Sequence, residues 1–172
     1  SFWTSQTNIE QIEWVKDLLL RLKISETIIV ISILDSGINN GHLLLQPLLA
    51  DKDCHSYNPE WGVYDNDEHG TLMSGLALFD NLQEKLENTL PIELKHKLES
   101  IKILPPKHND ENPYELWGEI TAQAISKAEI SNPNYKRILC MAVTSAQGTD
   151  KGRPSSWSAA IDSLTSGADD GV

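Results

Sequence analysis

The chain has 172 residues, of which 40% are hydrophobic and 23% charged, so it can bury the core of one domain and is not globally disordered. Its formal net charge of −11 argues against nucleic acid or an anionic membrane as the main partner, and no apolar run approaches the roughly 20 residues of a membrane span. The two cysteines make no disulfide framework, so we expect a reducing, cytoplasmic compartment.

The first third of the chain predicts a helix, a buried strand and a long loop. Thr7-Asn8-Ile9-Glu10 has the pattern of a capping box, and apolar residues then recur at helical spacing, which predicts a helix over 8–23. Residues 27–34 are short, β-branched and apolar, as in a strand that a parallel sheet buries on both faces. The turn residues Asp35-Ser36-Gly37 follow the strand, and residues 39–68 read as an irregular loop with one short strand near 54–57.

Helices and strands alternate through the rest of the chain. Apolar periodicity, β-branched runs and prolines give the boundaries. The expected elements are a helix over 70–87, a short helix from Pro91 to Leu98, a strand over 101–104, a helix over 114–130, a strand over 137–144, and a helix around Trp157, Ile161 and Leu164 that Gly167 closes.

This alternation predicts the α/β class, with a three-layer, mostly parallel sheet flanked by helices. We expect one domain over 1–172, in which 1–26 form an N-terminal helix and lead-in and 27–172 form the α/β core. Ligands of such sheets bind outside the carboxyl ends of the strands. Asp35 and the loops over 105–113 and 144–155 lie at those ends.

Two residues stand out as candidates for chemistry. Asp35 directly follows a buried strand, which holds a carboxylate rigidly, although Asp-Ser-Gly is also ordinary turn chemistry. A haloacid-dehalogenase-type phosphatase needs a second Asp where Gly37 stands, and the acidic pair and late Lys of a receiver domain are not evident. His69 stands at a predicted helix start, and taken alone it reads as a solvated loop residue.

Together, the two motifs are far more specific. Ile33-Leu34-Asp35-Ser36-Gly37-Ile38 and His69-Gly70-Thr71-Leu72-Met73-Ser74-Gly75 resemble the motifs of the subtilisin-like serine proteases, or subtilases. The resemblance extends over about 27–171 and implies a subtilisin-like fold. It implies that Asp35 is the carboxylate and His69 the base of a Ser-His-Asp triad that cleaves polypeptides as a serine endopeptidase.

The resemblance also implies where a substrate binds. Ile101-Lys102-Ile103-Leu104 looks like the family strand that ends in Lys-Val-Leu, and 140–144 take the place of the strand that ends in Asn-Met-Ser-Leu-Gly. The Ser and Gly of that second motif are missing, so the wall of the primary specificity pocket is altered. An extended substrate is expected to pair with backbone near 108–112 and 142–145. The expected substrate-binding residues are Asn109, Asp110, Ala142, Val143 and Thr144.

The family nucleophile is missing from the sequence. Its motif is Gly-Thr-Ser-x-Ala, whereas Gly148-Thr149 is followed by Asp150, and the oxyanion Asn is missing too. We therefore expect a domain truncated before its last strands, inactive as given, with a strand at 138–144 whose open edge invites self-association. Nearby hydroxyls offer alternative nucleophiles but read better as helix caps: Ser155, Ser156 and Ser158.

No cofactor is expected. Asp65, Asp67 and Glu68 read as a solvated acidic loop, with a calcium site as the alternative, and the histidines and cysteines lack metal-ligand spacing. Two other functions stay open. One is a non-catalytic subtilase-like interaction module that never had the Ser. The other is an unrelated α/β binding domain, in which Asp35 and His69 would lie far apart.

Overall fold

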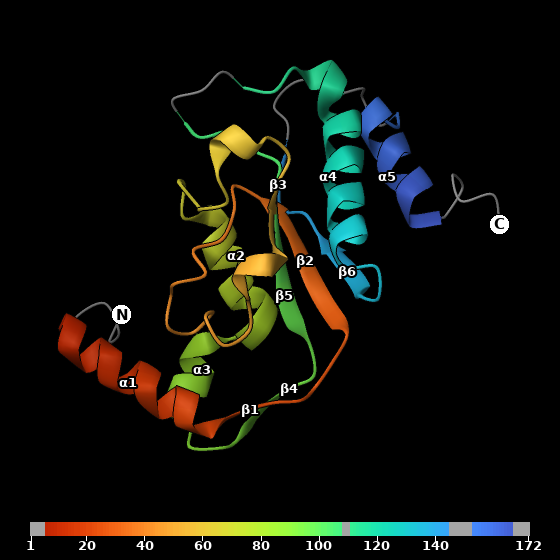
Figure 1. The fold of residues 1–172 in the computed structure, drawn as a ribbon. Helices are drawn as coiled ribbons and strands as arrows, with labels where there is room; N and C mark the ends of the chain where they lie inside the picture. The colour runs from red at the N-terminus through yellow and green to blue at the C-terminus, as the bar shows by residue number, and fades with distance from the viewer. Residues whose placement is uncertain (1–5, 108–110, 145–152, 167–172) are drawn as a thin grey trace.

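The computed structural model describes residues 6–107, 111–144 and 153–166. Its main sheet contains four parallel strands in the order β3 (Cys54–Ser56), β5 (Lys97–Lys102), β2 (Ile29–Asp35) and β6 (Lys136–Cys140). A separate parallel pair joins β1 (Leu22–Ile24) to β4 (Ile92–Leu94). Because the strands of the main sheet are parallel, their carboxyl ends share one edge, which is the upper edge in Figure 1.

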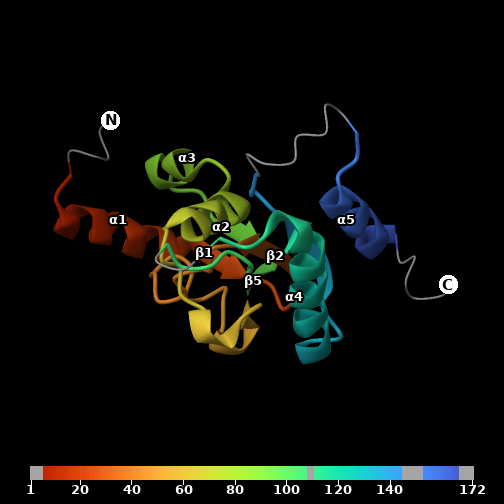
Figure 2. The ribbon, with the colours of Figure 1, turned by 90° about the horizontal axis from the view of Figure 1, so that it is seen from above.

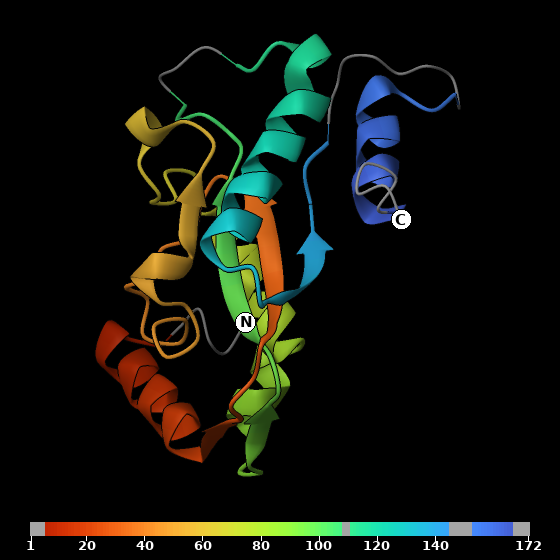
Figure 3. The same cartoon turned by 45° about the vertical axis from the view of Figure 1, so that its right-hand side comes forward.

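Helices cover both faces of the main sheet. In Figure 3 the sheet lies between helix α4 in front and helix α2 behind, which makes three layers. The sequence prediction of an α/β fold with a mostly parallel sheet flanked by helices is confirmed. The helices are α1 (Asn8–Arg21), α2 (His69–Phe79), α3 (Leu82–Glu87), α4 (Trp117–Ser131) and α5 (Ser156–Ser166), and single 3-10 turns occur at Asp51–Asp53, Pro59–Trp61 and Tyr114–Leu116.

Alternate residues of the strands supply two apolar clusters, one on each face of the sheet. Ile33 of β2 and Leu98 of β5 pack into the cluster that includes α2. Leu34 and Ile101, on the same two strands, pack into the cluster beneath α4. A strand that is apolar on both faces therefore holds Asp35 at its end with both sides covered.

Helix α1 lies at one side of this core, as Figure 2 shows from above, and the small sheet lies below the main sheet in Figure 1. The predicted capping box is present, since the Thr7 hydroxyl accepts from Glu10 N and the Glu10 carboxylate accepts from Thr7 N. The expected helix over 8–23 is too long, because residues 22–24 form β1. Strand β1 pairs with β4, about 70 residues later, and no local pattern reports that partner.

The region between α2 and β5 differs most from its prediction. The expected helix over 70–87 is two helices, because Asp80 has a left-handed φ of 55° and Asn81 caps α3 through Glu84 N. The expected short helix from Pro91 to Leu98 is wrong, since that stretch holds β4 and the start of β5. Strand β5 therefore begins four residues before the predicted 101–104.

The remaining expected elements are present with shifted ends. Strand β2 covers 29–35 rather than 27–34, α4 begins at Trp117 rather than 114, and β6 covers 136–140 rather than 137–144. Strand β3 ends one residue before the predicted 57, and the proposed cap Gly167 lies outside the described residues. In the described part of the chain, none of the helices combines the length and apolar character needed to cross a bilayer.

Candidate active site

The topology of the sheet places Asp35 at a natural ligand position. Strand β2 lies between β5 and β6, so the chain leaves it first toward one side of the sheet and later returns on the other. Ligands of α/β sheets bind outside the carboxyl ends of the strands at such a reversal. Asp35 is the last residue of β2, and its side chain is buried.

His69 is the first residue of α2, on the face of the sheet opposite α4. Its Nδ1 lies 2.8 Å from Oδ2 of Asp35, and 48% of its side chain is exposed against 1% for Asp35. The alternative of an unrelated domain, in which the two residues lie far apart, is therefore wrong. An ionised carboxylate only accepts hydrogen bonds, so this contact places the imidazole hydrogen on Nδ1. The lone pair on Nε2 is then the basic position.

The other oxygen of Asp35 is held by its neighbour. Asp35 Oδ1 accepts from Ser36 N at 2.7 Å and lies 3.0 Å from Ser36 Oγ. The backbone oxygen of Asp35 also accepts from Ile103 N at 2.9 Å, which ties the end of β2 to the chain that leaves β5. The carboxylate is thus fixed on both oxygens before any ligand binds.

A second carboxylate, Asp65, lies behind this pair. It accepts four hydrogen bonds, from Ser36 Oγ, Asp67 N, Thr71 N and Thr71 Oγ1. Partial burial raises the pKa of Asp65. The hydrogen bonds from Thr71, Asp67 and Ser36 lower it by a larger amount, so the pKa lies below its usual value.

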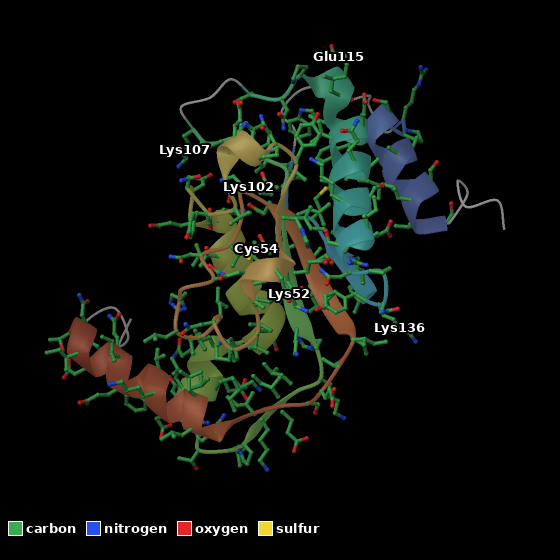
Figure 4. The ribbon with its side chains drawn as sticks, viewed as in Figure 1. Lys52, Cys54, Lys102, Lys107, Glu115 and Lys136 are labelled. Atoms are coloured by element: carbon green, nitrogen blue, oxygen red, sulfur yellow. The ribbon has the colours of Figure 1, made fainter. Side chains whose placement is uncertain are left out.

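Lys102 holds the loop that carries Asp65. It is the last residue of β5 (Figure 4), in register with Asp35, and its side chain is buried. Its ammonium donates to Tyr64 O at 2.6 Å and to Asn66 Oδ1 at 2.8 Å. Burial lowers the pKa of Lys102, and the nearby charge of Asp65 opposes this shift.

A cleft of about 440 Å³ reaches Ser36, the neighbour of Asp35, although neither Asp35 nor His69 lines it. Ser36 and Lys102 are among its lining residues, as are Asp67 and Lys107, which form an ion pair. Its wall toward α4 is largely apolar and includes Leu104, Pro105, Tyr114, Trp117 and Val143. A cleft with an apolar wall and a few polar groups has the character of a site for a flexible organic ligand.

The structure brings part of the expected substrate-binding set to this cleft. Val143 and Thr144 line it, whereas Ala142 is exposed and is not among its lining residues. Residues 142–144 follow the end of the β6 ladder at Cys140, so they lie beyond the paired strand. Asn109 and Asp110 lie outside the described residues.

One of the serines near α5, Ser155, has the geometry of a helix cap. Ser155 Oγ accepts from Ser158 N at 3.1 Å and lies 3.0 Å from Ser158 Oγ. Ser156 is the first residue of the helix. The favoured interpretation of these hydroxyls as caps is thus supported at Ser155, whereas the Ser158 hydroxyl only contacts that of Ser155.

The calcium alternative is less simple than the sequence suggests. Both carboxylate oxygens of Asp65 already accept hydrogen bonds, and the side chain of Asp67 pairs with Lys107. Among the residues that the structure describes, no group of three or more His, Cys, Asp or Glu side chains is placed to hold a metal ion.

Sequence reasoning found the central pair but missed its supports. In the sequence, Ser36 and Thr71 stand out only as members of the two motifs, and Asp65 only as part of an acidic loop. A signal was available, since Asp65 stands six residues before Thr71 and near the start of the helix that carries His69. A carboxylate there satisfies backbone N–H groups at the positive end of the helix dipole.

One comparison with known proteins assigns the chain to a family. The model of the subtilase family, peptidase S8, matches residues 27–172, which include Asp35, His69 and the whole main sheet. Comparison with curated proteins and comparison with solved structures gave no match. The family match covers most of the chain and agrees with both motifs and with the parallel sheet. The chain therefore belongs to the subtilase family of subtilisin-like serine proteases.

Proposed function

We propose that this chain supplies the Asp and the His of a Ser-His-Asp triad in a serine endopeptidase. The single observation that carries the proposal is the 2.8 Å contact between His69 Nδ1 and Asp35 Oδ2. The carboxylate is buried and the imidazole is half exposed, so the pair presents a basic nitrogen to a ligand while its acidic partner stays shielded.

Each residue of the pair has a separate role in this mechanism. Asp35 accepts the Nδ1 hydrogen of His69, which fixes the tautomer and stabilises the imidazolium that forms during the reaction. His69 Nε2 takes the proton from the hydroxyl of the nucleophilic Ser as that oxygen attacks the peptide carbonyl. It then gives the proton to the leaving amine.

The nucleophile is proposed to come from sequence that follows Val172. The motif Gly-Thr-Ser-x-Ala does not occur in the 172 residues, and Ser155 caps α5. The chain by itself is therefore expected to lack peptidase activity. In subtilisin, loss of the Ser lowers kcat roughly a millionfold.

The substrate is proposed to be an extended polypeptide that runs along the carboxyl edge of the sheet. Residues 142–144 lie beyond the β6 ladder and offer backbone for strand pairing, and the cleft next to Ser36 offers room for a side chain. The expected roles of Asn109 and Asp110 belong to the same proposal.

The test uses the protein that the complete gene encodes, treated with a fluorophosphonate probe that labels activated serines. We expect a Gly-Thr-Ser-x-Ala motif after Val172, labelling of that Ser, and loss of labelling in His69→Ala. His96→Ala is the matched control, since His96 contacts Ala77 O and not Asp35. A continuation without this Ser overturns the proposal and favours the non-catalytic interaction module. Labelling that survives in His69→Ala also overturns it, because the labelled serine is then activated without His69.

A further inference from the structure

Asp65, a carboxylate outside the proposed pair, contacts both of the elements that hold the pair. Asp65 Oδ1 accepts from Ser36 Oγ at 2.7 Å, and Ser36 directly follows Asp35. Asp65 Oδ2 accepts from Thr71 N at 2.8 Å and from Thr71 Oγ1 at 2.6 Å, and Thr71 is two residues after His69. Asp65 therefore ties the end of β2 to the start of α2.

Ser36 connects the two carboxylates through one hydroxyl group. Its Oγ lies 2.7 Å from Asp65 Oδ1 and 3.0 Å from Asp35 Oδ1, and it accepts from Gly70 N at 3.3 Å. A hydroxyl has a single hydrogen to donate. The shorter distance favours donation to Asp65, so less of that hydrogen is shared with Asp35. The carboxylate of Asp35 is then a stronger acceptor for the Nδ1 hydrogen of His69.

Asp65 is itself held in place. The buried ammonium of Lys102 donates to Tyr64 and Asn66, the residues on either side of Asp65 in the chain. Asp67 N closes a local turn on Asp65 Oδ1 at 3.0 Å. A side chain fixed in this way transmits its position to what it contacts, as supporting residues behind a reactive group do.

We propose that Asp65 is a positioning residue of the active site. Its carboxylate acts through Ser36 on Asp35 and through Thr71 on the first turn of α2, and so keeps the hydrogen of the His69 imidazole on Nδ1. This inference rests on the proposed function, because the tautomer matters only if His69 is the triad base. Asp65 contacts neither substrate nor reacting atoms in this scheme.

The test is nitrogen-15 spectroscopy of the His69 ring in the 172-residue chain, which needs no nucleophile. The chemical shifts of Nδ1 and Nε2 at alkaline pH give the ratio of the two neutral tautomers. We expect Asp65→Asn to lower the share of the Nδ1–H form, with a change in the ratio of roughly fivefold, which is the ratio that one net hydrogen bond maintains. Asp67→Asn removes the same charge from the same loop but only breaks the ion pair with Lys107, so it should leave the ratio unchanged.

Ser36→Ala keeps the test decisive if Asp65→Asn fails to fold. It removes the hydroxyl between the carboxylates and leaves the bonds from Thr71 to Asp65 in place. It should raise the share of the Nδ1–H form, because no part of the hydroxyl hydrogen is then shared with Asp35. If both folded variants keep the wild-type ratio, or if only their melting temperatures fall, the positioning role is overturned and Asp65 merely stabilises the loop.

Asp35→Asn separates failure of this inference from failure of the proposed function. If Asp35→Asn shifts the tautomer ratio and Asp65→Asn does not, the pair stands and only the role of Asp65 is lost. If even Asp35→Asn leaves the ratio unchanged, the contact between Asp35 and His69 does not set the tautomer, and both proposals fail.

Discussion

Gly70 lies directly against the carbonyl oxygen of Gly37, so helix α2 begins in contact with the turn that follows Asp35. An ideal Cβ at Gly70 would lie 2.1 Å from that oxygen and 3.2 Å from the Cβ of Asp35. No side chain fits in this space. The lack of a side chain at position 70 is therefore what allows His69 to reach the buried carboxylate.

Gly70→Ala should separate the two halves of the pair or unfold the domain. The new methyl group meets backbone rather than a flexible side chain, so we expect a loss of stability above about 3 kcal/mol, the upper end of ordinary overpacking. Urea unfolding measures this loss.

Gly75→Ala is the matched control on the same helix, since nothing lies within 4 Å of its ideal Cβ. There the change should be neutral or stabilise by up to about 1 kcal/mol, because Ala favours helix over Gly. Equal effects of the two substitutions would contradict the packing described here.

An ion cluster crosses the main sheet around Glu99, whose side chain is fully buried, and its partners Arg137 and His55 are partly exposed. Glu99 on β5 accepts from Arg137 Nε at 2.8 Å and from Ser32 Oγ at 2.6 Å, and His55 Nε2 lies 3.5 Å from it. Burial raises the pKa of Glu99, but the contacts with His55, Arg137 and Ser32 outweigh it and hold the pKa at about 2.

This cluster predicts a loss of stability in acid. In the unfolded chain Glu99 binds a proton below its ordinary pKa of about 4.5, whereas in the folded chain it stays ionised down to about pH 2. The stability that ionised Glu99 contributes at neutral pH is therefore lost as the pH falls across that interval. Between about pH 2 and 4.5, Glu99→Gln should reduce the slope of unfolding free energy against pH by an amount equivalent to up to about one bound proton. It should also destabilise the protein at neutral pH, because it leaves Arg137 without its buried partner. Denaturant titrations from pH 2 to 7 measure both effects, with the exposed Glu93→Gln as control. A wild-type slope in Glu99→Gln would refute this prediction.

Strand β6 forms one edge of the described sheet and pairs with β2 alone. Ile138 in its middle is 57% exposed, and Lys136 begins it (Figure 4). Exposed edges of this kind pair with further strands. We propose that a second copy of the chain pairs along 138–140, the part of the expected 138–144 edge that is strand.

Light scattering over a concentration series tests this association. The wild-type mass should rise with concentration, and Ile138→Lys should keep the chain monomeric because a charge disfavours edge pairing. Ile130→Lys is the control, since Ile130 is 81% exposed but lies on α4. A wild-type chain that stays monomeric at high concentration, or an equal effect of both variants, would contradict the proposal.

The central parts of the site were predictable because their signals are local. Residues 29–35 are apolar on both faces and end in a turn, which fixes a buried parallel strand with Asp35 at its end. The small residues after His69 belong to a motif whose spacing is specific. Neither signal depends on a partner elsewhere in the chain.

The rest depended on distant partners. Glu99 gives 97–102 a polar character in the sequence. Its partner Arg137 is 38 residues away and on another strand, so no local pattern shows that the charge is paired. The three-residue β1 and β4 exist only through their mutual pairing. In the sequence Asp65 is one charge in an acidic loop, and only the fold brings Ser36 and Thr71 into contact with it.

The most direct test of the account is a double-mutant cycle on Asp35 and His69 in the protein that the complete gene encodes. Peptide hydrolysis is measured for Asp35→Asn, His69→Ala and the double variant. In subtilisin, loss of the His lowers kcat about a millionfold and loss of the Asp about thirty-thousandfold, and the losses are far from additive. We predict losses of that order, with the double variant no slower than His69→Ala alone. Independent, multiplying effects, or near-wild-type activity in His69→Ala, would contradict the account.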